Sequence, residues 1–285
     1  MFQMLSSKLR ALAGRSGPVI PVVRLQGVID NGGLMRPGLN LANVATPLER
    51  AFRMKKAPAV ALVVNSPGGS AVQSRLITRR IRDLAAEHGK HVLVFVEDVA
   101  ASGGYMIAVA GDEIIVDPSS IVGSIGVIFS GFGFTGLIDR IGVERRVYTA
   151  GSNKSQLDPF RPENPDEIAH IRQLQLEIHE VFIDLVKERR GGRLADHPDL
   201  FTGQFWTGRA AVGLGLADRE GDLRSVVREK YGARAELRLV NPPRGLFGRR
   251  NGGGGGVAAS LLPATYADDL MAAVEARTLW SRYGL

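Results

Sequence analysis

Two glycine-rich segments, each placed after an apolar run, contain the residues best suited to do chemistry. The first is VVNSPGGS at residues 63–70, and the second is EDVAASGGY at residues 97–105. Each apolar run is typical of a buried strand that leads into the start of a helix, where free backbone N–H groups and the helix dipole favour negative charge. Paired glycines would let a substrate carbonyl approach those N–H groups closely. For the first segment, a tight turn that requires glycine is an equally good interpretation.

Ser102 stands at the start of the helix predicted after the second segment. It has two interpretations: an N-cap, whose hydroxyl accepts a backbone N–H, or an exposed nucleophile beside the N–H of Gly103. The strands before the two segments are predicted to be neighbours in a parallel sheet, which would bring both loops to the same carboxyl edge. Together the loops would then form an oxyanion hole.

A nucleophilic serine needs a base, and the histidines are poorly placed for that role. None of the five histidines lies between residues 91 and 170, and the chain has no cysteine, so a thiolate nucleophile is excluded. Lysine is the remaining candidate, and Lys154 follows the apolar run 143–149 within a loop. Desolvation there would let its amine lose the proton near neutral pH, although composition alone favours an ordinary surface lysine. Ser124, between two glycines, would be able to hydrogen-bond the amine.

The elements that must position these residues alternate between strands and helices. We expect strands over residues 19–29, 59–64, 91–97, 113–116 and 143–149, and helices over 46–56, 70–88, 102–110, 136–141, 165–190, 207–214 and 222–231. Apolar strands separated by helices predict an α/β fold built on a mainly parallel sheet. Apolar residues recur at helical spacing over 165–190, which predicts a helix facing the core.

Composition and missing motifs exclude several classes of protein. A chain of 285 residues with 45% hydrophobic and 23% charged residues is neither disordered nor a disulfide-stapled miniprotein. The net charge is +7, but the basic residues are dispersed without interleaved aromatics, so we expect no nucleic-acid partner. No apolar run approaches the ~18 residues of a membrane span, and no phosphate-binding loop or zinc-protease motif is present. We expect no cofactor, no metal and a cytoplasmic location.

Three regions follow from the changes in pattern along the chain. Residues 1–17 place apolar side chains at helical spacing between basic ones, which fits either docking on the protein itself or peripheral contact with a membrane surface. Residues 18–240 form the main domain. Residues 241–285 begin with a linker that contains Gly252–Gly256 and end in a tail with a possible helix over 266–283.

In order and spacing, five motifs resemble those of serine peptidases of the signal peptide peptidase A type, relatives of Clp protease and of the crotonases. The resemblance covers roughly residues 19–240. The motifs are NSPGG at 65–69, ASGGY at 101–105, GSIG at 123–126, the loop around Lys154, and GQFWTG at 203–208 followed by GLAD at 215–218.

The resemblance implies a Clp/crotonase-like α/β spiral and a role for each candidate residue. It makes Ser102 the nucleophile, Lys154 the general base and Ser124 the residue that orients Lys154, with the backbone N–H groups of Gly69 and Gly103 as oxyanion donors. It also implies a serine endopeptidase that cleaves signal-peptide-like or other unfolded apolar peptides in a homo-oligomeric ring or dome. Family members with a membrane anchor or two such domains differ from this chain, so the dyad must come from one subunit or from its contact with a neighbour.

Two alternatives remain open at this point. A crotonase-like acyl-CoA enzyme would use the paired N–H groups to hold a thioester enolate, and a noncatalytic assembly protein would keep the fold without turnover. The ASGG junction and the lysine loop favour the peptidase over the acyl-CoA enzyme. The presence of both Ser102 and Lys154 counts against the noncatalytic protein.

Overall fold

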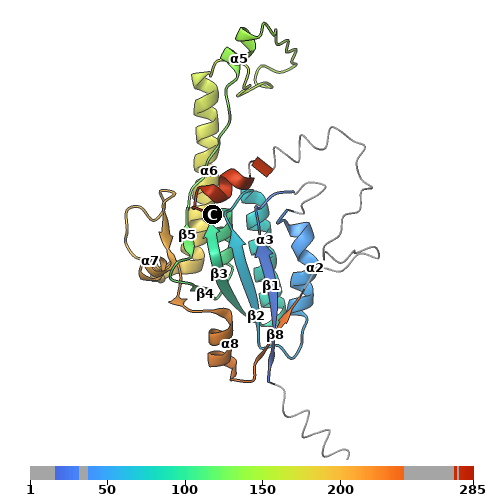
Figure 1. Cartoon of the computed structure of the whole chain (residues 1–285), viewed down its shortest axis with the longest axis vertical. Helices are drawn as coiled ribbons and strands as arrows, with labels where there is room; N and C mark the ends of the chain where they lie inside the picture. Colours follow the sequence, from blue (N-terminus) through green and yellow to red (C-terminus); the bar gives the residue numbers. More distant parts are fainter. Residues whose placement is uncertain (1–16, 32–37, 241–272, 275) are drawn as a thin grey trace, which may run out of the picture.

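A computed structural model describes residues 17–31, 38–240, 273–274 and 276–285 (Figure 1). The amphipathic N-terminal segment and the linker with Gly252–Gly256 lie outside the described residues, so both remain predictions. Within the described part of the chain, no helix is long and apolar enough to cross a membrane.

An eight-stranded, mainly parallel sheet forms the centre of the molecule (Figure 1). Six of its strands lie in the order β6-β5-β3-β2-β1-β8, and β4 and β7 branch from β3. Its long strands are β1 (Val19–Gln26), β2 (Ala59–Ser66) and β3 (His91–Ala101). The short ones are β4 (Glu113–Val116), β5 (Ile121–Gly123), β6 (Phe205–Thr207), β7 (Arg219–Glu220) and β8 (Glu236–Leu239). Every residue of β2 is buried, as expected for a central parallel strand that is covered on both faces.

Strand β3 pairs with two different strands along its length. Residues 93–96 pair with β4, and residues 99–101 pair with β5. β4 then pairs with β7, while β5 continues into the antiparallel β6. This split turns the sheet, and it leaves the ends of β2, β3 and β5 side by side at one edge.

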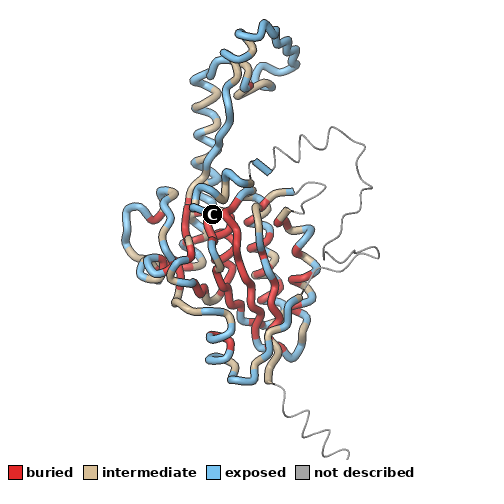
Figure 2. Tube along the Cα trace, viewed as in Figure 1, coloured by how far each residue is buried: buried red, intermediate tan, exposed pale blue. Residues whose placement is uncertain are grey.

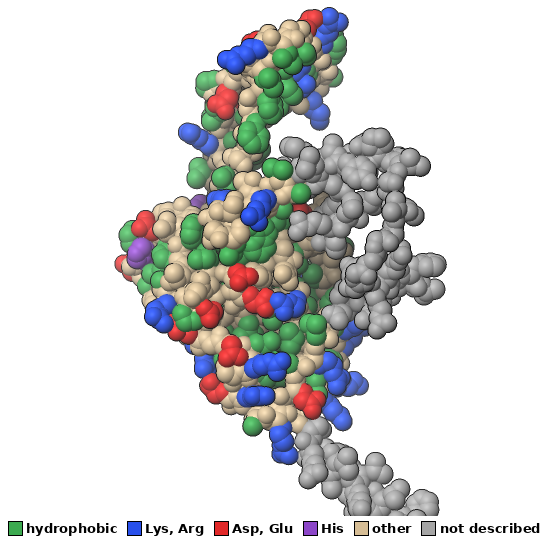
Figure 3. Space-filling model, viewed as in Figure 1, with side chains coloured by type: hydrophobic (Ala, Val, Ile, Leu, Met, Phe, Trp, Pro, Cys, Tyr) green, Lys and Arg blue, Asp and Glu red, His purple; other side chains and the backbone are tan. Residues whose placement is uncertain are grey.

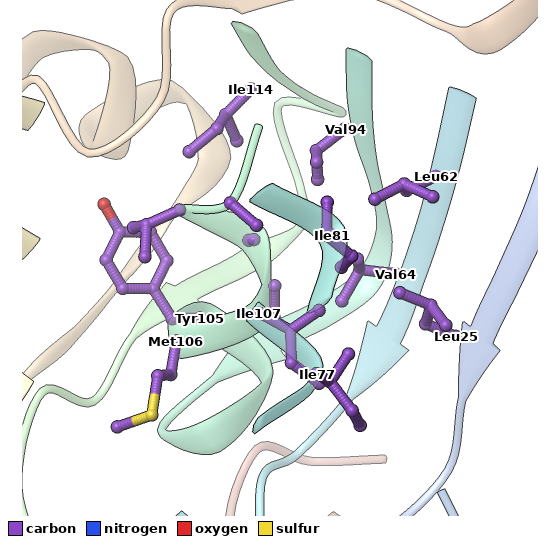
Figure 4. Close-up of a cluster of buried hydrophobic side chains, with 14 of the residues drawn as sticks. Leu25, Leu62, Val64, Ile77, Ile81, Val94, Tyr105, Met106, Ile107 and Ile114 are labelled. Atoms are coloured by element: carbon purple, nitrogen blue, oxygen red, sulfur yellow. The ribbon is translucent and has the colours of Figure 1, made fainter. Parts of the chain in front are cut away.

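Helices pack on both faces of the sheet, whose strands contain most of the buried residues (Figure 2). The larger core cluster joins one face to α2 (Leu41–Phe52), α3 (Ala71–His88) and α4 (Gly103–Ala108), and Figure 4 shows part of it. The smaller cluster packs α8 (Leu223–Tyr231) on the opposite face through Val226 and Val227. The remaining helices are α7 (Gly208–Gly213) and the 3-10 helix η1 (Gly191–Arg193).

Residues 127–164, with α5 (Thr135–Arg140) and the first half of α6 (Pro165–Arg190), project from this body as an arm (Figures 1 and 2). Two predictions fail here. Residues 143–149 form no strand, because no strand pairs with them in the described chain. Helix α6 does not face the core along its length: its buried residues are only Phe182, Val186 and Arg190, so none of the described residues buries the apolar face of its first half.

Candidate active site

Ser102 occupies the sharp turn between β3 and α4. Its backbone has φ 52° and ψ −122°, in the left-handed region that non-glycine residues rarely adopt. The turn is held by the Ser102 N–H, which donates to the Gly123 carbonyl at 2.8 Å. Although Ser102 stands at the N-cap position of α4, its side chain makes no capping hydrogen bond. The hydroxyl of this half-buried residue is therefore not committed to the helix.

The loop after β2 brings two glycines beside this turn. Gly68 and Gly69 both have positive φ, 106° and 138°. Ile29 fixes the loop from the other side: its N–H donates to the Gly68 carbonyl at 2.8 Å, and its carbonyl accepts from the Ser70 N–H at 2.7 Å. A Cβ on Gly69 would lie 2.2 Å from the Ile29 oxygen, so no other residue fits here without moving the loop.

The two loops touch, as the neighbouring parallel strands β2 and β3 require. A Cβ on Gly68 would lie 2.8 Å from the Ser102 Cβ, and a Cβ on Gly103 would lie 3.4 Å from the Gly69 nitrogen. Neither the Gly69 N–H nor the Gly103 N–H finds an acceptor among the described residues. Two uncommitted donors thus lie close together beside Ser102, which is the arrangement that stabilises a developing oxyanion.

Three polar side chains that the sequence did not single out hold the loops in place. The Asn65 side chain joins them, because its Nδ2 donates to Asp98 Oδ2 at 2.6 Å and its Oδ1 accepts from the Val99 N–H at 3.3 Å. Ser66 Oγ accepts from the Gly68 N–H at 3.2 Å. The signal for Asn65 was a polar residue at the end of an otherwise apolar strand.

Ser124 lies next to Ser102 because β5 pairs with the end of β3, with Gly123 opposite Ala101. It is buried, has φ 53° and donates its N–H to the Gln204 carbonyl at 2.7 Å. Its Oγ accepts a hydrogen bond from the hydroxyl of Tyr283 at 3.3 Å, a contact that nothing in the sequence pattern predicted.

Lys154 lies on the arm, outside this cluster. It is exposed, and its side chain makes no hydrogen bond or ion pair with the described residues. The expectation that Lys154 is desolvated is therefore wrong for the single chain, because the strand expected before it does not form and the segment 141–164 lies with α5 at the far end of the arm (Figure 1).

The loop around Lys154 is nevertheless fixed to its neighbours at the outer end of the arm, which we call the head. Asp158, whose side chain is only 2% exposed, accepts from the Phe160 N–H at 3.0 Å and from Arg145 Nε at 2.9 Å. These two bonds, the first being the stronger influence, hold the pKa of Asp158 below its ordinary value despite burial. The Phe160 ring packs on Phe134, with 5.5 Å between centroids.

A pocket of about 410 Å³ adjoins the glycine loop. One wall is formed by Val28 to Asn31 and by Gly69, Ser70 and Gln73, and the other by Ala276 and Leu279 of the C-terminal segment. The pocket thus lies directly beside one of the two uncommitted N–H donors.

Comparison with known proteins places this arrangement in a family. The profile of peptidase family S49 matches residues 85–237. "Protease 4" of Haemophilus influenzae is 33% identical over 213 residues, and "Serine protease SPPA, chloroplastic" of Arabidopsis thaliana is 32% identical over 211. The match to the Haemophilus protein covers 74% of this chain and 34% of that protein. The match to the Arabidopsis protein covers 72% of this chain and 31% of that protein.

A protein of Brucella abortus named "Na(+)/H(+) antiporter NhaA" is 61% identical over 271 residues, which cover 93% of this chain but 37% of that protein. The chain thus spans about a third of the length of these relatives. Among solved structures, a mutant of the membrane-bound stomatin-specific protease 1510-N has a TM-score of 0.51 at 18% identity, over 80% of this chain and all of that one. The fold is the Clp/crotonase-type α/β fold expected from the sequence, and the chain belongs to peptidase family S49.

Proposed function

We propose that the chain is a serine-type peptidase with Ser102 as nucleophile and Lys154 as general base. The observation that carries the proposal is the strained Ser102 turn, whose uncapped hydroxyl lies beside the uncommitted N–H groups of Gly69 and Gly103. Membership of family S49 supports it.

In the proposed reaction, Ser102 Oγ attacks the carbonyl carbon of the peptide while its proton passes to the neutral amine of Lys154. The carbonyl oxygen becomes an oxyanion that accepts from the Gly69 and Gly103 N–H groups. When the tetrahedral intermediate collapses, the C–N bond breaks and Lys154 gives the proton to the leaving amine. Water then attacks the acyl-enzyme while Lys154 takes a proton from it. When the second tetrahedral intermediate collapses, the bond from the carbonyl carbon to Ser102 Oγ breaks and Lys154 returns the proton to Ser102, which restores the hydroxyl and the neutral amine.

We propose that the dyad is completed between two copies of the chain. The arm exposes large apolar side chains that need cover, and Figure 3 shows hydrophobic side chains gathered on it. They are Ile128, Phe129, Phe132, Leu137, Ile141, Val143, Val147 and Tyr148. An exposed apolar surface of this kind supports a docking role for the arm. Docking on a second copy would bury Lys154, which a lysine base requires.

Membership of family S49 and the resemblance to signal peptide peptidase A-type enzymes support an apolar peptide as substrate. The pocket beside Gly69, which Val28 lines among polar residues, offers such a peptide an apolar contact. We therefore propose unfolded apolar segments as the substrate class. Cleavage of a disordered apolar peptide, with no cleavage of the same sequence inside a folded domain, is the expected result.

Active-site labelling tests the proposed nucleophile. A fluorophosphonate should modify the wild-type chain at Ser102, and Ser102→Ala should abolish both the label and peptide cleavage. Lys154→Ala should lower turnover by about 1,000-fold or more, because the two residues act as a unit. Labelling that persists in Ser102→Ala would contradict the proposal, and an unlabelled wild-type chain without cleavage would favour the noncatalytic alternative.

A further inference from the structure

The C-terminal segment 276–285 lies against the candidate active site. Figure 1 draws its helix in red, next to the base of the arm and the ends of β3 and β5. Two contacts of Tyr283 attach it: the hydroxyl donates to Ser124 Oγ at 3.3 Å, and the ring stands edge-on to Phe205, with centroids 5.2 Å apart. One and two turns earlier, Leu279 and Ala276 line the pocket beside Gly69.

Local hydrogen bonds set the position of Tyr283. Its N–H donates to the Trp280 carbonyl at 3.0 Å, and Leu285 N–H donates to the same oxygen at 3.3 Å. Gly284, with φ 76°, makes this closing turn possible. Tyr283 therefore leaves the helix at a defined turn that directs its ring toward Phe205 and its hydroxyl to Ser124.

Both surfaces that the segment covers are ones that the proposed reaction needs. The family resemblance makes Ser124 the residue that would orient the Lys154 amine, and here its hydroxyl is bonded to Tyr283. The pocket adjoins Gly69, one of the two proposed oxyanion donors, so a substrate chain bound there would lie beside that donor. The segment therefore covers both Ser124, where the lysine base would bind, and the pocket beside Gly69, where the substrate would bind.

We propose that the segment 276–285 is a latch that competes with the arm of a second copy for the surface around Ser124 and Phe205. This inference rests on the proposed function. In the separate chain, the Tyr283 hydroxyl takes the place at Ser124 that the lysine amine needs. The latch is displaceable, because the contacts that attach it to the other described residues are weak: the hydrogen bond to Ser124, the edge-on ring contact with Phe205 and the edge of the pocket. An arriving arm displaces Tyr283, opens the pocket and brings Lys154, so activity appears only on assembly.

Three full-length variants test the latch. Tyr283→Ala removes both contacts, Tyr283→Phe removes the hydroxyl and keeps the ring, and Arg282→Ala changes an exposed neighbour that makes no hydrogen bond with the described residues. The rate of Ser102 labelling by a fluorophosphonate is measured against chain concentration. We expect the concentration for half-maximal labelling to fall about threefold in Tyr283→Phe, as one net hydrogen bond predicts. It should fall further in Tyr283→Ala and stay unchanged in Arg282→Ala.

Amide hydrogen exchange of residues 278–285 gives a readout that needs no activity. In the wild-type chain at low concentration these amides should be protected, and in Tyr283→Ala they should exchange faster. The latch is overturned if these amides exchange freely in the wild-type chain, or if Tyr283→Ala has the same concentration for half-maximal labelling as wild type. In either case, labelling of Ser102 would still support the proposed function. A chain that is unlabelled in every variant and at every concentration overturns the proposed function and the latch with it.

Discussion

Ser102 has a backbone conformation with positive φ that is unfavourable for any residue with a Cβ. A residue held in such a conformation lowers the stability of the fold by about 1–3 kcal/mol. The chain tolerates that cost because β5 fixes the turn through the Gly123 carbonyl and because Gly68 leaves room for the Ser102 Cβ. The strain, and the lack of a capping bond, distinguish this serine from an ordinary N-cap. Local strain that brings no gain in stability is typical of a functional residue.

Ser102→Gly and Ser102→Ala should differ in stability even though both lack the hydroxyl. Glycine adopts φ 52° without steric cost, whereas alanine keeps the strain of the Cβ. We expect the glycine variant to be more stable than the alanine variant by about 1 kcal/mol in urea unfolding. Equal stability of the two variants would show that the turn is not strained.

Gly69→Ala should remove activity while the matched variant Gly27→Ala keeps it. Both glycines have positive φ, but a Cβ on Gly69 would lie 2.2 Å from the Ile29 oxygen, and a Cβ on Gly27 would meet nothing within 4 Å. Moving the Gly69 N–H should lower kcat about 100-fold or more. Circular dichroism of both variants checks that the fold is kept, and a similar loss of kcat in both would count against the oxyanion role.

In the part of the chain that the structure describes, the outer end of the arm is held together by contacts within the arm and not by contacts with the body. Its head is held together by contacts of its own, with Asp158 at their centre and the Phe134–Phe160 pair beside it. The first half of α6 joins it to the body while leaving apolar side chains such as Leu176, 63% exposed, without cover. A head held together by its own contacts, on a connecting helix, suits the proposed docking on another copy.

Asp158→Asn should weaken the arm without weakening the body. The variant keeps an acceptor for the Phe160 N–H but removes the charge that pairs with Arg145. We expect lower peptidase activity because the lysine loop loses its fixed position. Thermal unfolding of the body should be unchanged, and Glu144→Gln, which removes an exposed partner of Arg146, serves as the control. A variant with normal activity would show that Asp158 does not support the loop.

In the molecule as a whole, a buried ionic network joins α6 to the sheet. Arg190, whose side chain is 1% exposed, donates to both carboxylate oxygens of Asp218 at 2.9 and 3.0 Å, and Asp218 also accepts from the Ile114 N–H at 2.7 Å. Burial alone would raise the pKa of Asp218, but the hydrogen bonds from Arg190 and Ile114 outweigh it and hold the pKa below its ordinary value.

The sign of this shift predicts loss of stability in acid. A carboxyl group whose pKa is lower in the folded state stabilises the fold above its unfolded pKa of ~3.9, and this contribution disappears as the pH falls through the folded value. Urea unfolding should therefore show stability falling below about pH 4, and Asp218→Asn should reduce that slope. At pH 7 the variant should be less stable by about 3 kcal/mol, because it leaves Arg190 buried without its charge partner. A variant with the same acid slope as wild type would contradict this role.

The strand-loop-helix units around both glycine loops were predictable because their signals are local: an apolar run, a glycine pair and a helix start. The short strands β5 to β8 were missed, since none of them contains a continuous apolar run like that of the similarly short β4, which was predicted. Apolar spacing correctly predicted a helix over 165–190, but the expectation that it faces the core holds only for its second half, because the spacing does not say which part of the chain the apolar face meets. The Tyr283–Ser124 contact joins residues 159 positions apart, and no local pattern encodes such a distance.

The central claim, a dyad shared between copies, can be tested by mixing two inactive variants. Ser102→Ala supplies Lys154, and Lys154→Ala supplies Ser102. If each site takes Ser102 from one copy and Lys154 from another, an equimolar mixture that assembles at random should recover about a quarter of wild-type turnover. Each variant alone should stay inactive at the same total concentration. A mixture that remains as inactive as its components, although light scattering shows that mixed assemblies form, would contradict the shared dyad.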